Sequence, residues 1–179
     1  MEKWEQIQKR FQEAGLVLSE KQAGQFAAYA ELLVQWNEKM NLTSITDFEE
    51  MVEKHFLDSL TLLAWPKLKQ GAKVIDVGTG AGFPGIPLKI MRPDIDLTLL
   101  DGTMKRLNFL GEVCAALKVS ARRVHKRAEE AGLDKTMRER YDLATARAVA
   151  SLPVLAEYCM PLIKMKGCYI DEEMFRGFN

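Results

Sequence analysis

Long apolar runs and clustered metal ligands are missing from this 179-residue chain. It has no run of about 18 apolar residues, and its first five residues, Met-Glu-Lys-Trp-Glu, lack the apolar core of a signal peptide. The three cysteines, Cys114, Cys159 and Cys168, are too scattered for a zinc site or a disulfide framework. We therefore expect a cytoplasmic protein with no metal ion and no membrane contact, in which the cysteines are small core residues.

An excess of one charge is also missing, because 25 basic side chains balance 25 acidic ones. This disfavours a globally basic nucleic-acid clamp but leaves room for a local basic patch. The best candidate is residues 118–127, which carry five Lys or Arg and no acid. Such runs are more often a solvated surface, yet Arg122, Arg123, Lys126 and Arg127 are candidate RNA-binding residues.

The first 70 residues carry helical signals, and we expect them to form an N-terminal helical lobe ahead of a core domain at residues 71–179. Capping patterns begin at Ser19 and Asp47, and each precedes apolar residues at helical spacing. His55 and Asp58 lie three apart on one predicted helix face, as an acid–base pair would. An orienting hydrogen bond between lobe and core is the better interpretation, because both are distant in sequence from the glycine-rich stretch described next.

That stretch covers residues 73–87. The apolar, β-branched run at residues 74–77 is typical of a strand buried on both faces. Gly78, Gly80 and Gly82 follow at alternate positions, where a backbone turns tightly and passes close to a ligand. A strand, a glycine turn and an apolar helix together predict a nucleotide-type site at the carboxyl edge of a parallel sheet.

The spacing of this loop separates three ligand classes. Ile86 follows Gly85 where a phosphate-gripping loop needs Lys-Ser or Lys-Thr, and Phe83 stands where a dinucleotide fingerprint needs a small residue. Asp76, two residues before the first glycine, completes a pattern that looks like the first motif of class I S-adenosylmethionine-dependent methyltransferases. A carboxylate favours that cationic cofactor. The alternative is a tight turn that binds no ligand. Three glycines and an aspartate are more than such a turn requires, so this alternative is disfavoured.

Asp101 follows the next apolar run, at residues 95–100. A carboxylate at the end of this strand accepts hydrogen bonds from two ribose hydroxyls, in a nicotinamide or a methionine cofactor alike. It therefore indicates an adenosine-type ligand without choosing between them. A helix N-cap role for Asp101 is compatible with this one.

Beyond Asp101, apolar runs continue to alternate with helical patterns. Strands are expected at residues 123–125, 141–146 and from residue 168, and Arg147 lies at the carboxyl end of the fourth strand. Glu129 or a neighbouring backbone N–H is placed to meet an adenine. The fold class is therefore α/β, a Rossmann-like, doubly wound parallel sheet behind a helical lobe.

The residues after the fourth strand limit the methyl acceptor. An Asn-or-Asp-Pro-Pro-aromatic run, which grips an exocyclic base amine, is absent from residues 145–149. Cys159 lies inside a helical pattern rather than in the Pro-Cys turn that pyrimidine carbon-5 methylation uses. An acceptor that is already nucleophilic, such as a purine ring nitrogen, needs only alignment with the methyl group.

Several separated motifs closely resemble the bacterial small-subunit ribosomal RNA guanine-N7 methyltransferases, once called glucose-inhibited division protein B. They are residues 36–45 (Trp-Asn-Glu-Lys-Met-Asn-Leu-Thr-Ser-Ile), 55–60, 76–87, Leu100-Asp101 with Lys105-Arg106, 127–129 and 146–148. The resemblance covers residues 16–168 and implies methyl transfer from S-adenosylmethionine to N7 of one guanine in 16S ribosomal RNA. It implies the 16S RNA or the small ribosomal subunit as partner and a role in rRNA processing. We also expect a monomer.

The resemblance also implies roles for single residues. Gly78, Gly80, Phe83 and Asp101 line the cofactor, and Asp76 and Gly82 belong to the same motif. Ala128 and Glu129 approach the adenine, and Arg147 stands between cofactor and RNA. Since methylation places a positive charge on the guanine, we expect Arg147 to contact a phosphate or the cofactor carboxylate rather than the base.

One departure concerns the residues after Ile170. They do not resemble the family's continuation, a helix and a two-stranded antiparallel finish, so we expect a C-terminally shortened homologue with the last strands of the sheet missing and the fifth strand exposed as an edge. Two rivals to an active methyltransferase stay open. One is a remnant that binds cofactor or RNA without chemistry, and the other is a nicotinamide-dependent oxidoreductase.

Overall fold

The computed structural model describes residues 1–147 and 150–171. Its centre is a five-stranded sheet of order β3-β2-β1-β4-β5 in which every pairing is parallel. The strands are β1 (Lys73–Val77), β2 (Asp96–Asp101), β3 (Arg122–His125), β4 (Tyr141–Ala146) and β5 (Ile163–Asp171). The strand order reverses between β1 and β4, which is the switch point where open α/β sheets bind ligands. The predicted α/β class is confirmed.

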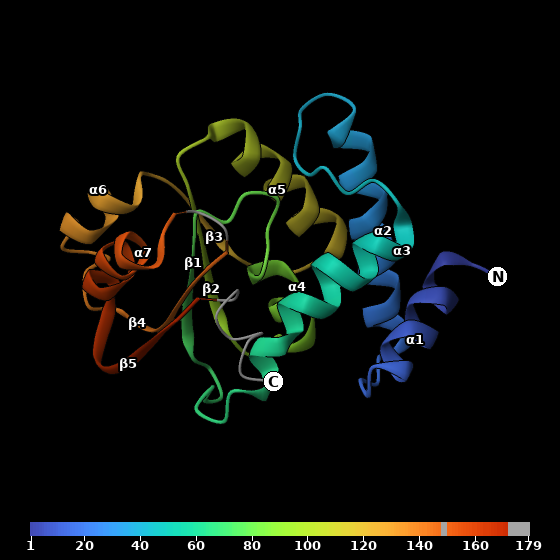
Figure 1. Ribbon diagram of the computed structural model, residues 1–179, viewed down its shortest axis with the longest axis horizontal. Helices are drawn as coiled ribbons and strands as arrows, with labels where there is room; N and C mark the ends of the chain where they lie inside the picture. The colour runs from blue at the N-terminus through green and yellow to red at the C-terminus, as the bar shows by residue number, and fades with distance from the viewer. Residues whose placement is uncertain (148–149, 172–179) are drawn as a thin grey trace.

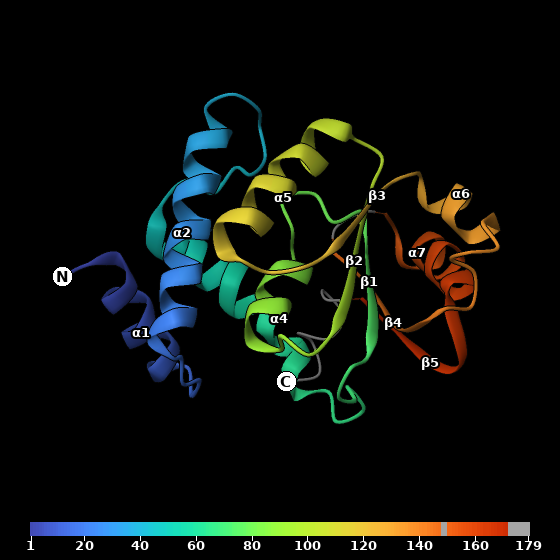
Figure 2. The same cartoon turned by 180° about the vertical axis from the view of Figure 1, so that it is seen from behind.

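Helices cover both faces of this sheet (Figures 1 and 2). The helical elements are α1 (Lys3–Glu13), α2 (Glu20–Asn37), α3 (Phe48–Met51), the π-helix η1 (Val52–Leu57), the 3₁₀ turns η2 (Leu60–Ala64) and η3 (Met160–Leu162), α4 (Gly85–Met91), α5 (Met104–Leu117), α6 (Ala128–Leu133) and α7 (Leu152–Cys159). The N-terminal helices, α4 and α5 lie on one side, and α6 and α7 lie on the other.

The capping patterns begin helices as predicted. The Ser19 hydroxyl accepts the Gln22 N–H at 3.2 Å, and the Asp47 carboxylate accepts the Glu50 N–H at 2.9 Å. The helix that begins after Asp47 does not stay regular. After α3 it continues as the π-helix η1, whose wider turn contains an extra residue and changes the direction in which the side chains point. His55 lies on this widened turn.

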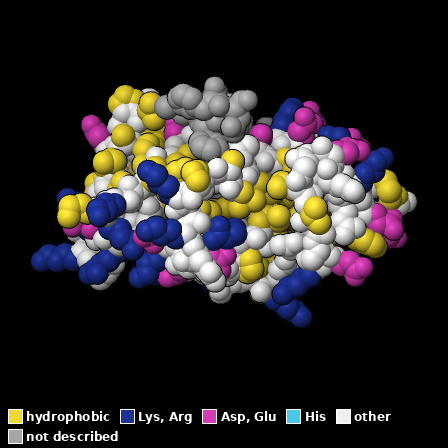
Figure 3. Space-filling model, turned by 90° about the horizontal axis from the view of Figure 1, so that it is seen from below, with side chains coloured by type: hydrophobic (Ala, Val, Ile, Leu, Met, Phe, Trp, Pro, Cys, Tyr) yellow, Lys and Arg dark blue, Asp and Glu magenta, His cyan; other side chains and the backbone are white. Residues whose placement is uncertain are grey.

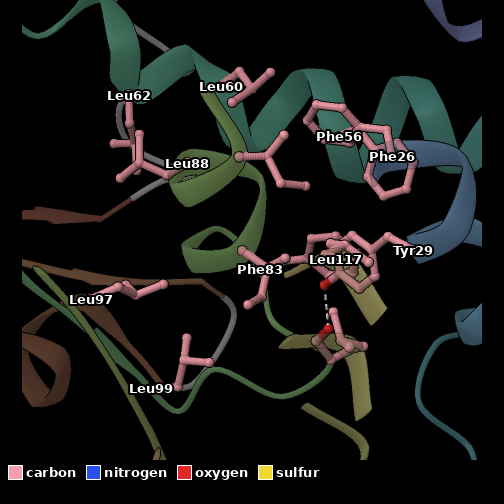
Figure 4. Packing of buried hydrophobic residues seen from close by; sticks show 14 of the residues in the cluster. Phe26, Tyr29, Phe56, Leu60, Leu62, Phe83, Leu88, Leu97, Leu99 and Leu117 are labelled. Atoms are coloured by element: carbon pink, nitrogen blue, oxygen red, sulfur yellow. Dashed lines mark hydrogen bonds between the residues drawn. The ribbon is translucent and has the colours of Figure 1, made fainter. Parts of the chain in front are cut away.

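The N-terminal helices and the sheet share one hydrophobic core. Phe26, Tyr29 and Phe56 belong to the same buried cluster as Phe83 and Leu88, which come from the glycine loop and α4, and Figure 4 shows them gathered together. The Phe26 and Phe56 ring centroids lie 5.1 Å apart. A second, smaller cluster lies under α6 and α7. The buried side chains of residues 1–70 thus do not form a cluster apart from the sheet.

The edge strand β5 begins earlier than expected, at Ile163 rather than Cys168. Its register with β4 shifts between Tyr141 and Leu143, so extra residues bulge out. Among the described residues no strand pairs with its outer side. The tail expected to lack the family's last strands, residues 172–179, lies outside the described residues. No helix in the described ranges is long and apolar enough to cross a bilayer.

Candidate cofactor site

A buried carboxylate holds the glycine loop between β1 and α4. The Asp76 side chain is fully buried, and its Oδ2 accepts hydrogen bonds from the Thr79 hydroxyl at 2.7 Å and the Gly85 N–H at 2.9 Å. The two bonds tie the start of the loop to the start of α4. Asp76 is not among the residues that line the cavity described below, so the structure gives it a supporting position rather than the predicted lining one.

Gly82 supports the loop from behind. It has a φ of +101°, and an added Cβ would lie 2.5 Å from the Tyr29 hydroxyl oxygen and 2.8 Å from Leu110. The Tyr29 hydroxyl itself donates to the Ala81 carbonyl at 2.5 Å, the dashed line in Figure 4. Glycine is required here because helix α2 comes close, and Gly82 does not line the cavity either.

Gly80 and Asp101 form the open side of the loop. Gly80 has a φ of +60°, and an added Cβ would meet nothing within 4 Å. Its N–H donates to Asp101 Oδ2 at 2.9 Å, and Asp101 Oδ1 accepts the Thr103 N–H at 2.8 Å. Thr103, not Asp101, is the N-cap residue of α5. A carboxylate has about four lone-pair sites, so Asp101 can still accept hydrogen bonds from a ligand.

Both residues open onto a cavity of about 560 Å³ at the carboxyl edge of the sheet. This volume lies within the range that holds small molecules and cofactors. Nine predicted site residues line it: Gly78, Gly80, Phe83, Asp101, Lys126, Arg127, Ala128, Glu129 and Arg147. These nine residues come from four separate segments that meet at one place, as the topology of a parallel sheet requires.

Arg147 lies on a stack of rings at one wall of this cavity. Its guanidinium carbon is 4.9 Å from the Phe83 ring centroid, and the His55 ring stacks on Phe83 at 4.5 Å with an interplanar angle of 13°. Arg147 Nη2 lies 2.9 Å from His55 Nδ1, and His55 Nε2 lies 2.7 Å from the Thr43 hydroxyl. Because arginine only donates, Nδ1 must accept, so the proton of the neutral ring lies on Nε2 and is donated to Thr43.

Another wall carries the acidic and basic residues that follow β3. The Glu129 backbone N–H and the Tyr158 hydroxyl hold the pKa of the Glu129 carboxyl below its usual value, so this side chain is ionised at neutral pH. Lys126 forms an ion pair with Asp134 and, as the largest cause, lowers the pKa of that carboxyl. Arg127 is exposed at the cavity rim.

The basic run at residues 118–127 does not form one patch. Lys126 and Arg127 line the cavity, whereas Arg122 begins β3 and so lies at the opposite, amino edge of the sheet. Arg123 donates to the Leu107 carbonyl at 2.8 Å and packs against Gly111 of α5. A strand separates the two ends of the run, so only two of its four predicted RNA-binding residues, Lys126 and Arg127, line the cavity.

Sequence reasoning missed several residues of the cavity wall. His55 was expected to make only a contact between lobe and core, yet it lines the cavity, and so do Leu42, Thr43, Arg106 and Tyr158. Long-range packing brings them there, which no local pattern reports. A usable signal was present for all of them except Tyr158, because the others fall within the motifs at residues 36–45, 55–60 and 105–106.

Comparison with known proteins identifies the family. A model described as GidB, rRNA small subunit methyltransferase G, matches residues 22–171. The chain belongs to this family. It is 53% identical over 163 residues to ribosomal RNA small subunit methyltransferase G of Alkaliphilus metalliredigens, covering 90% of this chain and 68% of that protein. The Clostridium perfringens protein of the same name is 44% identical over 171 residues, covering 95% and 72%.

The chain spans about two thirds of the length of the GidB relatives that it matches, such as the Acetivibrio thermocellus protein, of which it covers 64% at 52% identity. Solved structures agree on the fold. A SAM-dependent methyltransferase from Thiobacillus denitrificans, in complex with S-adenosyl-L-homocysteine, superposes with a TM-score of 0.53 at 20% identity, over 64% of this chain and 47% of that one. The fold is that of class I S-adenosylmethionine-dependent methyltransferases.

The residues present suit such a cofactor. Gly80 leaves space where a backbone must come close to a ligand, and the Asp101 carboxylate faces the same cavity while only 3% exposed. A buried carboxylate with unused lone pairs suits the paired hydroxyls of a ribose. Lys-Ser or Lys-Thr, which a triphosphate would need, is absent after Gly85.

Proposed function

We propose that this chain transfers a methyl group from S-adenosylmethionine to N7 of a guanine in 16S ribosomal RNA. One observation carries the proposal beside the family membership. The Gly80 N–H and the Asp101 carboxylate are joined at 2.9 Å at the mouth of a cavity that also contains Arg147. The arrangement provides an adenosine-type site next to a cationic side chain.

Within this proposal, Asp101 receives the ribose hydroxyls of the cofactor and Gly78 and Gly80 let its amino-acid end approach the loop. Ala128 and Glu129 approach the adenine. Asp76 and Gly82 act indirectly, since their contacts hold the loop in shape. Bound S-adenosylmethionine supplies a methyl carbon made electrophilic by a positively charged sulfur.

The reaction requires little from the protein beyond alignment. The in-plane lone pair of guanine N7 is already nucleophilic, so no residue must remove a proton. Transfer would break the bond from sulfur to the methyl carbon as the bond to N7 formed, so the base would gain the positive charge that the cofactor would lose. Lys126 and Arg127, at the cavity rim, suit the phosphates that flank the guanine. Arg147, which donates to His55, suits the cofactor carboxylate or a phosphate better than the base that becomes positive.

We further propose that the protein acts as a cytoplasmic monomer. Its substrate belongs to the ribosome, and described residues of one chain, from Leu42 to Tyr158, line the cavity. Sedimentation of the purified chain at several concentrations measures this state directly.

Transfer of radiolabelled methyl groups to small subunits that lack the modification tests the function. We expect incorporation at one guanine, mapped by the chain cleavage that N7-methylguanine allows. Calorimetry of S-adenosylmethionine binding is run beside it. Cofactor binding without incorporation would favour the remnant that does no chemistry, and reduction of a nicotinamide cofactor would favour the oxidoreductase.

A further inference from the structure

A second hollow lies at the amino edge of the sheet, away from the cofactor cavity. It has a volume of about 280 Å³ and is lined by Lys73, Arg122 and Arg140, together with Asp96 and Thr136. Lys73 and Arg122 are the first residues of β1 and β3, and Arg140 directly precedes β4. The topology of the sheet therefore gathers three cations that are far apart in the sequence.

The charges of this hollow are not balanced. Lys73, Arg122 and Arg140 are all exposed, and none of them forms an ion pair with a carboxylate in the part of the chain that the structure describes. The nearby carboxylate of Asp142 accepts the Lys73 backbone N–H at 2.8 Å and pairs with Lys164 at 2.8 Å. Asp96 alone faces three cations across the hollow, so an anion would be attracted to it.

The surroundings add the charge of Lys166 and fix the backbone of Arg140, whereas the charge of Lys164 is offset by Asp142. The bulge of β5 projects Lys164, Met165 and Lys166 at this edge, and Met165 is 94% exposed. The Arg140 N–H donates to the Leu162 carbonyl at 3.1 Å, which fixes the backbone of that cation. Figure 3 views the molecule from this end, and Lys and Arg side chains gather in its left half, the side of β4, β5, α6 and α7.

We propose that the hollow formed by Lys73, Arg122 and Arg140 binds backbone phosphates of ribosomal RNA, as a second contact that holds the enzyme on its substrate. The proposal rests on the proposed function, which makes a folded RNA the partner. Exposed arginine and lysine side chains that pair with no carboxylate suit phosphate oxygens, and release of counterions favours the contact. Such contacts position a protein on RNA without reading a sequence.

The distance between the two sites decides what the second contact can do. β1 spans five residues from Lys73 to the start of the glycine loop, which is about 17 Å at the rise of a strand. Phosphates beside the target guanine therefore contact the cavity rim, whereas the hollow contacts another segment of the folded RNA. Strand β3 lies within the basic run, so the run places Arg122 at the hollow and Arg127 at the cavity rim.

The test compares two triple variants, one that removes the three positive charges of the hollow and one that removes three positive charges elsewhere. One variant of the full chain carries Lys73→Gln, Arg122→Gln and Arg140→Gln, and the matched control carries Lys9→Gln, Lys21→Gln and Lys39→Gln, which are equally exposed around α1 and α2. Binding to deproteinised 16S RNA is measured by filter retention across a range of salt concentrations. We expect the first variant to bind about tenfold more weakly at low salt. The slope of log affinity against log salt should also become shallower by about 2.

The control variant should keep the slope of the unchanged chain, and both variants should bind S-adenosylmethionine normally by calorimetry. Equal slopes for the two variants would overturn the second contact. Normal binding of the first variant to free RNA, with loss of binding only to assembled subunits, would assign the hollow to a ribosomal protein and also overturn it. If the triple variant loses cofactor binding, Arg122→Gln alone replaces it, with an expected slope change of about 0.7.

Failure of the proposed function gives a different result. Methyl transfer by the unchanged chain is measured on both the deproteinised 16S RNA and small subunits that lack the modification. No transfer, with the difference in slope preserved, would count against the activity alone. Transfer with equal slopes would count against the second contact alone.

Discussion

At the scale of single residues, His55 has the most informative contacts. It accepts a hydrogen bond from Arg147, donates one to Thr43 and stacks on Phe83. We infer that it is a positioning residue, because it acts on a bound ligand through Arg147. A guanidinium that is not held in place loses side-chain entropy when it binds a ligand. The hydrogen bonds of His55 to Arg147 and Thr43 restrict Arg147 beforehand, so less entropy is lost on binding.

We expect His55→Phe, which keeps a flat ring against Phe83 but removes both ring nitrogens, to raise the KM for S-adenosylmethionine about tenfold and to change kcat less. Arg147→Ala should have the same pattern, weakening binding more than the chemical step. Initial rates over a range of cofactor concentrations, with calorimetry of binding, measure both effects.

His55→Asn is the matched control. Its amide oxygen can accept from Arg147 at the place of Nδ1, so part of the affinity should return. An unchanged KM with a collapsed kcat in His55→Phe would instead place His55 in the reaction itself. Loss of thermal stability without a change in either constant would reduce its role to packing.

At the scale of elements, the glycine loop depends on helix α2. Gly82→Ala forces a Cβ against the Tyr29 hydroxyl at 2.5 Å in a left-handed backbone, whereas Gly80→Ala meets no atom within 4 Å. We expect Gly82→Ala to lower the free energy of unfolding by about 3 kcal/mol, and Gly80→Ala by about 1 kcal/mol. Gly80→Ala should instead reduce cofactor binding, since its Cβ enters the cavity. Urea denaturation and calorimetry separate the two.

Tyr29→Phe tests whether contact with the Tyr29 hydroxyl causes the loss of stability in Gly82→Ala. Removing the hydroxyl relieves the shortest contact of the new Cβ, although those with Leu110 and Ile86 remain, so the two changes together should cost less than the sum of their separate costs. Strict additivity would mean that the strained backbone of Gly82 or its contacts with Leu110 and Ile86, rather than the contact with Tyr29, set the penalty.

These elements also show what the sequence could predict. Short apolar runs, each followed by a glycine or a polar residue, were sufficient to predict the parallel sheet and the meeting of Gly80, Asp101 and Arg147 at its carboxyl edge. The reason for glycine at Gly82 was not predictable, because the atom that it avoids belongs to Tyr29, in a distant helix. The position of His55 was not predictable from its local pattern either, since it depends on a π-helical turn and on how the N-terminal helices pack; only its place in the motif at residues 55–60 pointed to the site.

At the scale of the whole molecule, the shared core predicts cooperative unfolding. All three tryptophans, Trp4, Trp36 and Trp65, lie in the first 70 residues, whereas every strand of the sheet comes later. If one core joins the two parts, tryptophan fluorescence and far-ultraviolet circular dichroism should give the same urea midpoint and the same slope. Both probes are followed on one sample.

Cys159 provides an independent probe from the other side of the sheet. It is fully buried, and burial raises the pKa of its thiol to about 12, so it should react with a thiol reagent only on unfolding. Its labelling should follow the same transition. A fluorescence change well before the loss of circular dichroism would show that residues 1–70 unfold as a separate lobe.

The cavity wall has a further consequence for biosynthesis. Its residues come from Leu42, ahead of the first strand, to Tyr158, in the last helix before β5. A chain that emerges from the ribosome N-terminus first can build the glycine loop and the Asp101 carboxylate early. The part of the wall that contains Tyr158 can form only after nearly all the described residues have been synthesised. We therefore expect the cofactor to be bound only after most of the described residues have been synthesised.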